Sequence, residues 1–241
     1  MMKLNSTDLT KASCLKSLEA NNDDMKLINK YTLSPLTADD VFTFKTVMGT
    51  NEFNDRNYEP FTKSALEDLK NLYPGKPMIF NHDIYSKQVA RVYDTELVVD
   101  AGKQTEGGEP YTELIAKAYM AKTSDNESLI TDIKAGIVKE VSTGFRVSKL
   151  VCNICGKDNI KSSCPHLPGV KYAVNGSSEK KPCHLVIENC SDAYELSFVN
   201  VPAQPNAGTR KAYEEKQMKE TNEKERLQLY VDCMKYKEEI K

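Results

Sequence analysis

The chain has 241 residues, of which 39% are hydrophobic and 28% are charged, a composition typical of a soluble globular protein. Its formal charge of −2 argues against nucleic acid as the main partner, because phosphate binding needs a clustered basic surface. No apolar run reaches the length of a membrane span, and the first ten residues lack the apolar core of a secretory signal. We therefore expect no membrane partner and a reducing compartment.

The chain begins with a polar, weakly patterned stretch, which we predict to be a flexible arm over residues 1–36. Val41–Val47 is rich in β-branched and aromatic residues and predicts a strand. Apolar residues at helical spacing predict a helix over Thr62–Tyr73, which ends at Pro74. Further strand-like runs follow at residues 77–80, 88–93, 96–99, 111–121, 138–150, 184–187 and 194–201.

A second helix is expected after Ser124–Glu127, a sequence that matches a capping box, with its end at Gly136. Residues 210–241 are dense in Lys and Glu and carry apolar residues at helical spacing, which predicts a charged helical tail. Many short strands with two or three helices indicate one mainly-β domain of the α+β class over residues 37–209.

Five of the seven cysteines fall in one short stretch, and in a reducing compartment this clustering favours a metal site over disulfides. The pattern is Cys152-x-x-Cys155 followed by Cys164-x-His166, two pairs of the ligand types that bind zinc tetrahedrally. Four protein ligands leave no open position. We therefore predict a structural zinc ion, not a catalytic one.

The zinc ligands lie in an insert over residues 151–183, which has little apolar sequence of its own. Zinc would then supply the folding energy of this insert. Cys183 or His184 can replace one of the four predicted ligands, whereas Cys190 is assigned to packing. The insert either shapes a neighbouring cleft or docks on a partner, and the sequence does not decide between these roles.

Three segments outside the insert contain residues that can do chemistry. His82 follows the apolar run Met78–Phe80, where a strand can deliver a side chain to a cleft, although, taken alone, this position favours a surface-loop histidine. Ser142 lies near Gly144 in a strand, and we expect the glycine to leave room for a substrate carbonyl. A serine hydroxyl needs a base in contact, and histidine is the usual one.

Glu195 interrupts a strand that is otherwise apolar at Leu196 and Phe198. A carboxylate in that position either faces water or is buried with a partner. In a serine hydrolase, the third member of the catalytic set is commonly a carboxylate that orients the histidine. Asp192 is the nearest alternative to Glu195 for that role.

Taken in order, Met78–Asp83, Glu140–Phe145 and Tyr194–Ala207 resemble the prohead proteases of tailed bacteriophages, a family distantly related to the herpesvirus capsid maturation proteases. The last segment, which contains Glu-Leu-Ser-Phe-Val-x-Val-Pro-Ala, is the most specific. The resemblance runs from about Val41 to Ala207. It implies an antiparallel β-barrel, closed or nearly closed, with flanking helices.

The resemblance also implies a serine endopeptidase with Ser142 as nucleophile, His82 as general base and Glu195 as the residue that orients His82. Its substrates would be the scaffold protein, the scaffold segment of the major capsid protein, and the protease itself. It would act in the bacterial host cytoplasm, inside the phage procapsid, and the dimeric herpesvirus relatives imply a homodimer.

The alternative is a catalytically inactive zinc-binding protein of capsid assembly on the same fold. A zinc-ribbon nucleic-acid module is disfavoured because the insert has no platform of aromatic and basic residues. A metallopeptidase is disfavoured further, because the chain lacks an HExxH motif and the predicted zinc is fully ligated.

Overall fold

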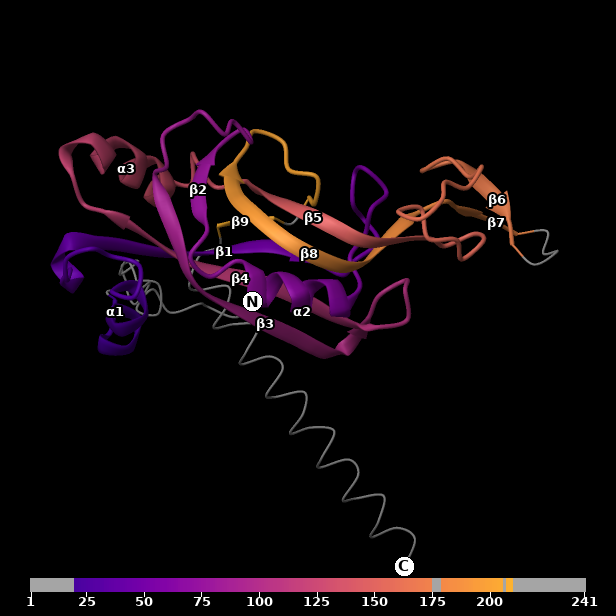
Figure 1. The fold of residues 1–241 in the computed structure, drawn as a ribbon, viewed down its shortest axis with the longest axis horizontal. Coiled ribbons are helices and arrows are strands. Elements are labelled where there is room, and N and C mark those ends of the chain that lie inside the picture. The colour runs from indigo at the N-terminus through magenta and orange to yellow at the C-terminus, as the bar shows by residue number, and fades with distance from the viewer. Residues whose placement is uncertain (1–19, 175–178, 206, 210–241) are drawn as a thin grey trace, which may run out of the picture. The chain divides into compact units, whose positions relative to one another are not determined.

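A seven-stranded sheet is the centre of the computed structural model, which describes residues 20–174, 179–205 and 207–209. From one edge to the other the sheet consists of β5 (Val141–Cys152), β8 (Leu185–Phe198), β2 (Pro77–Phe80), β3 (Ala90–Gln104), β4 (Pro110–Ala121), β1 (Val41–Thr50) and β9 (Gly208–Thr209) (Figure 1). The prediction of a mainly-β fold with flanking helices is thus confirmed.

The predicted barrel is wrong, because the sheet is open. Its edge strands β5 and β9 do not share a ladder. Within the described residues they are joined only through one bridge, between Glu140, just before β5, and Gly208 in β9. Within the described residues β9 consists of Gly208 and Thr209. The sheet is also not wholly antiparallel, because β2 pairs with β8 in parallel register.

Two pairs of predicted strands are single long strands. The predicted runs 88–93 and 96–99 belong to β3, which passes through an irregularity between Val92 and Asp94. The runs 184–187 and 194–201 belong to β8. The polar residues between each pair look like loops in the sequence, but the strands continue through them by shifts in register, as at bulges.

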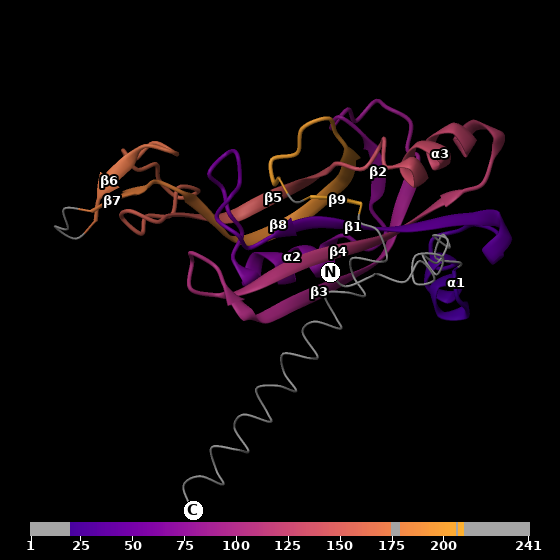
Figure 2. The same cartoon turned by 180° about the vertical axis from the view of Figure 1, so that it is seen from behind.

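The helix α2 (Lys63–Leu72) matches the prediction, with Thr62 as its N-cap. The Thr62 hydroxyl accepts a hydrogen bond from the backbone N–H of Ala65. Ala65, Leu66 and Leu69 are buried in the main core against residues of the sheet. In both views of the ribbon α2 lies between β8 and β3 (Figures 1 and 2).

The helix α1 (Asn22–Ile28) lies within the stretch that we predicted to be a flexible arm. Asn21 caps it through a capping box, and Ile28 is fully buried in a second apolar cluster with Val41 and Tyr93. The polar stretch before residue 37 therefore contains one well-packed helix, which its sequence pattern did not indicate. Residues 1–19 of the predicted arm and the predicted tail, residues 210–241, lie outside the described residues.

The helix α3 (Glu127–Ala135) begins later than predicted. Ser124–Asn126 forms a short 3₁₀ turn (η2), and no side chain caps α3, so the predicted capping box is wrong. The predicted end at Gly136 is confirmed, because this residue adopts the left-handed conformation with φ 73°. A second 3₁₀ turn, η1 (Ala38–Asp40), precedes β1.

The predicted insert forms the connection between β5 and β8. It contains the small antiparallel pair β6 (Lys171–Ala173) and β7 (Lys180–Pro182) and extends past the far end of β5 and β8 (Figure 1). None of the helices in the described part of the chain has the length and apolar character that a membrane span requires.

Tyr73, the C-cap of α2, fixes this helix to the centre of the sheet. Its side chain is fully buried, and its hydroxyl lies 3.1 Å from the carbonyl oxygens of both Gly144 in β5 and Glu195 in β8. The hydroxyl therefore shares its one proton between the backbones of β5 and β8 at the level of Glu195.

We predict that Tyr73→Phe lowers the free energy of unfolding by about 1–3 kcal/mol, because two buried carbonyls lose their donor. Urea denaturation of the purified protein measures this difference. Tyr85→Phe is the matched control, since Tyr85 is 92% exposed and should change stability by less than about 0.5 kcal/mol. Equal stability of both variants would contradict the assigned role of Tyr73.

Candidate active site and metal centre

The central strand β8 brings the predicted catalytic residues together. It carries Glu195 and pairs on one side with β5, where Gly144 lies opposite Glu195 and Ser142 lies opposite Ser197. On its other side it pairs with β2, which leads directly into His82. Strand pairing alone therefore gathers residues that are more than 100 positions apart in the sequence.

Glu195 is only 7% exposed, and polar contacts compensate the burial of its carboxylate. Its Oε1 lies 2.8 Å from Nδ1 of His82, and its Oε2 accepts a hydrogen bond of 2.5 Å from the hydroxyl of Ser197. The Ser197 oxygen in turn accepts a bond of 2.9 Å from the backbone N–H of His82. Ser197 thus holds both the carboxylate and the backbone of the histidine.

Gly144 has a different role from the one we predicted. We expected its missing side chain to make room for a substrate carbonyl. Instead, a Cβ atom at this position would lie 2.0 Å from Oε1 of Glu195. The space beside Gly144 is therefore taken by the carboxylate that contacts His82.

The backbone before the imidazole is in an uncommon conformation. Asn81 and His82 both have positive φ values, 52° and 57°, in the left-handed region that non-glycine residues rarely adopt. The turn follows β2 directly, and it is fixed by the Asn81 N–H, which donates to the carbonyl of Phe198, and by the bond from His82 to Ser197. Such strain is typical of functional sites, where the surroundings hold a residue in place.

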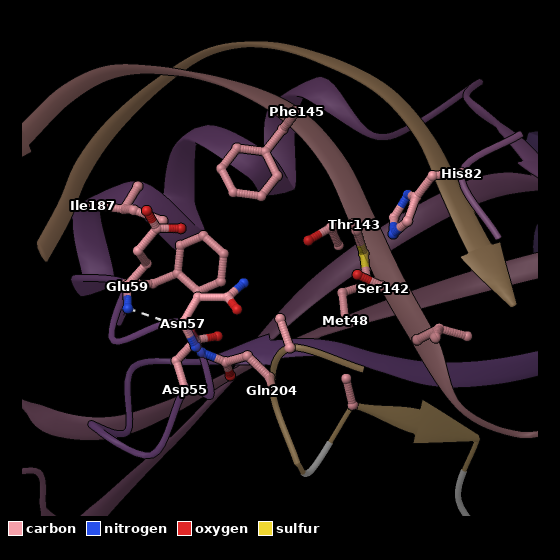
Figure 3. A pocket seen from close by; sticks show the side chains of 14 residues that line it. Met48, Asp55, Asn57, Glu59, His82, Ser142, Thr143, Phe145, Ile187 and Gln204 are labelled. Carbon is pink, nitrogen blue, oxygen red and sulfur yellow. Dashed lines mark hydrogen bonds between the residues drawn. The ribbon is translucent and has the colours of Figure 1, made fainter. Parts of the chain in front are cut away.

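Ser142 and His82 line the same pocket, which has a volume of about 250 Å³. Figure 3 shows them at one end of it, with the imidazole ring pointing to the side of Ser142. Within the described part of the chain the Ser142 hydroxyl has no hydrogen-bond partner. The two side chains thus share a cleft but do not form the hydrogen bond of a catalytic pair. In apo structures such a bond is often long and forms fully only when substrate binds.

Two carboxylates lie toward the other end of the pocket, those of Asp55 and Glu59 (Figure 3). One Asp55 oxygen accepts bonds from the N–H groups of Asn57 and Glu59. Burial raises the pKa of Asp55 above its usual value despite these bonds. Burial, followed by the nearby charge of Asp55, also raises the pKa of Glu59.

Asp192, the alternative partner for the histidine, lies elsewhere. Its Oδ1 accepts a bond from the N–H of Ala193 and lies 3.7 Å from Nζ of Lys76. Its side chain is about half exposed. No contact with His82 is found for Asp192, whereas Glu195 makes one at 2.8 Å.

The four predicted metal ligands come together in the insert. The ligand atoms of Cys152, Cys155, Cys164 and His166 all lie within 4.8 Å of one another, and this cluster can hold a metal ion. Cys152 Sγ lies 3.7 Å from Nδ1 of His166. Burial raises the pKa of Cys152. Desolvation also acts to raise the pKa of Cys164, but hydrogen bonds with His166, Asn159 and Cys152 together outweigh it and lower this pKa to about 6.

The other candidate ligands differ in position. The Cys183 sulfur lies 3.8 Å from that of Cys152 but outside the group of mutually close ligand atoms. The His184 ring packs against Phe53, with centroids 5.1 Å apart, and burial lowers its pKa. Cys190 is buried in the main core, as predicted for a packing residue.

The insert contacts the segment that carries the acidic end of the pocket. The ring of Tyr58, which lies between Asp55 and Glu59, has its centroid 5.6 Å from that of His184. A Cβ atom at Gly169 would lie 2.7 Å from this tyrosine ring. The N–H of Leu185 donates to the carbonyl of Tyr58. Tyr58, which lies between two pocket-lining residues, is therefore packed against Gly169 of the insert and against His184 and Leu185, which directly follow the insert.

Sequence reasoning missed Ser197, Asp55, Glu59 and Gln204 as site residues. Ser197 had a usable signal, because residues two apart on a strand share a face and Glu195 is two residues away. Asp55 and Gln204 lie in stretches that belong to the resemblance, residues 54–58 and Tyr194–Ala207, but neither pattern marks these side chains or Glu59 as site residues. Only the tertiary fold places them at the pocket beside β5. No protein-family model, curated protein or solved structure matches the chain.

We predict that Gly144→Ala lowers the free energy of unfolding by about 1–3 kcal/mol, because the added methyl must displace the buried Glu195 carboxylate. Thermal and urea denaturation measure the loss. Gly102→Ala in β3 is the control, because its Cβ would meet only the Asp100 carboxylate, at 3.4 Å. A variant at Gly144 as stable as the wild type would show that Glu195 does not depend on this space.

Proposed function

We propose that this protein is a serine endopeptidase of tailed-phage capsid maturation, with Ser142, His82 and Glu195 as its catalytic residues. The observation that supports this most directly is the 2.8 Å contact between His82 Nδ1 and a buried carboxylate, beside a pocket that Ser142 also lines. The phage and capsid context rests on the resemblance of three sequence segments, with a herpesvirus-protease-like arrangement as part of the proposal.

The chemistry follows from the two nitrogens of the imidazole. Nδ1 carries the proton that it donates to Glu195, which leaves Nε2 free to accept the proton of the Ser142 hydroxyl. The deprotonated oxygen attacks the peptide carbonyl, and the imidazolium then gives its proton to the leaving amine. Glu195 fixes the tautomer and stabilises the imidazolium. Ser197 holds Glu195 and the His82 backbone in position through one hydrogen bond to each.

In this proposal the metal is zinc and its role is structural. Tetrahedral bonds of about 2.3 Å to sulfur and about 2.0 Å to nitrogen place a sulfur and a nitrogen ligand about 3.5 Å apart, near the 3.7 Å between Cys152 Sγ and His166 Nδ1. Four ligands leave zinc no open position for a substrate. It would stabilise the insert that packs against Tyr58 and so support the pocket wall indirectly.

The second candidate is the inactive zinc-binding assembly protein. One observation favours it, the absence of a hydrogen bond between Ser142 and His82 among the described residues. Under this reading the cleft binds a polypeptide without cutting it. The two candidates differ in whether Ser142 is nucleophilic, and that property can be measured directly.

We predict that a fluorophosphonate labels the wild-type protein at Ser142 and that Ser142→Ala abolishes labelling. Coexpression with the major capsid protein should give cleaved subunits with wild type and intact ones with this variant, since losing the nucleophile costs at least about a thousandfold in rate. Ser148→Ala, an exposed serine of the same strand, is the control and should label normally. Absence of labelling in the wild type would favour the inactive assembly protein.

We predict about one zinc per chain by elemental analysis, as four-ligand sites bind. Cys152→Ser should lose the metal and unfold the insert, because metal binding supplies its folding free energy. Limited proteolysis should then cut within residues 153–182 at rates at which the wild type stays intact. The Cys190→Ala variant should keep its zinc. Loss of zinc from this variant would contradict the assigned ligand set.

A further inference from the structure

Glu59 is an acid without a partner in the candidate substrate pocket. Its side chain is half-buried and lines the pocket beside Asp55. Within the described ranges the Glu59 carboxylate accepts no hydrogen bond and makes no ion pair. Burial, followed by the nearby charge of Asp55, raises its pKa and so disfavours its charged form. A carboxylate that loses water without gaining a cation is unstable, and a ligand with positive charge would relieve that cost.

The walls around Glu59 suit a long aliphatic chain. Phe61, Phe145 and Ile187 line the same pocket, and the rings of the two phenylalanines lie 5.4 Å apart. Figure 3 shows the Glu59 carboxylate on the side of the pocket where Ile187 and Phe145 lie. Lysine and arginine bury their methylene stems on apolar surface and extend a charged end to a polar partner.

A second feature of the pocket also lacks a partner. Gln204 is only 5% exposed, and its Oε1 accepts from the N–H of Thr50, yet its Nε2 has no hydrogen-bond partner among the described residues. Its side chain runs toward the end of the pocket that holds Asp55 (Figure 3). A buried amide donor with no acceptor is costly, and a carbonyl oxygen of a bound polypeptide would satisfy it.

We propose that this end of the pocket is a specificity subsite, in which Glu59, assisted by Asp55, binds a lysine or arginine side chain of the polypeptide cleaved at Ser142. The inference rests on the proposed peptidase function and names its substrate class. The methylene stem packs against Phe61 and Phe145, and Gln204 donates to a substrate carbonyl. Glu59 is thus a specificity residue and takes no part in the chemical steps.

Other side chains fit this subsite less well. An acidic side chain would meet two carboxylates of its own sign. An apolar side chain would fill the space against Phe145 but would remove water from Glu59 without supplying a charge, which leaves a buried acid unpaired. A cationic side chain is the one class that satisfies both the apolar wall and the acid.

The test begins with the full-length protein and a proteome-derived peptide mixture. Mass spectrometry of the new termini should show lysine or arginine enriched at one fixed position relative to the cut bond. Two synthetic peptides that differ only there, with lysine or with the uncharged norleucine, should then differ in kcat/KM by at least about tenfold. Cleavage without a preference for basic residues would overturn the subsite and leave the peptidase proposal intact.

Variants assign the preference to Glu59. Glu59→Gln should bring the lysine-to-norleucine ratio close to one, mainly by slowing the lysine peptide, while Glu127→Gln, an exposed acid in α3, keeps the wild-type ratio. Fluorophosphonate labelling of Ser142 in each variant shows that the catalytic residues are intact. If Glu59→Gln fails to fold, Glu59→Asp should still prefer lysine, with a smaller ratio.

The outcomes separate the two proposals. An unchanged ratio in a labelled, folded Glu59→Gln protein overturns the assignment of Glu59. If the wild-type protein neither cleaves peptides nor is labelled, the proposed peptidase function is wrong, and the proposed subsite is then wrong as well.

Discussion

The candidate site depends on how the fold accommodates one carboxylate that is almost entirely removed from water. Glu195 lies in the central part of the sheet, where an isolated charge would be expensive. It is tolerated because His82 and Ser197 each contact one of its oxygens and because Gly144 leaves the space it needs. The strand pairing, the glycine and the turn at His82 together meet that requirement.

The parallel pair between β2 and β8 is the feature that makes the contact geometrically available. Because β2 runs alongside β8 and stops at Phe80, opposite Phe198, the following turn folds back over Ser197. An antiparallel β2 would deliver the same turn to the other end of β8. The open, mixed sheet is therefore connected directly to the placement of the imidazole.

Local sequence patterns predicted the parts of the fold that local physics controls. The helix after Thr62 and the glycine that ends α3 follow from capping and apolar spacing, and the metal cluster follows from the spacing of its ligands. The sequence did not reveal that polar residues within β3 and β8 continue a strand, because register shifts depend on the neighbouring strands. It also did not reveal the open sheet, since closure depends on which edge strands pair in the tertiary fold.

The candidate site divides in the same way. His82, Ser142 and Glu195 stand in recognisable segments, and the structure brings His82 and Glu195 into contact while Ser142 shares their pocket. The acidic wall was beyond sequence reasoning. Residues Asp55 and Glu59 belong to a turn-rich stretch with no pattern of its own, and their importance arises only where that stretch meets β5 and the segment around Gln204.

The contact between the insert and Tyr58 links the evolution of two segments that are far apart in the sequence. The turn from Asp55 to Glu59 contains the left-handed Tyr58, whose ring packs against Gly169 of the insert and against His184, which directly follows the insert. A chain without the insert would have to shorten or rebuild that turn. The two regions, far apart in sequence, should therefore be gained, lost and altered as one unit.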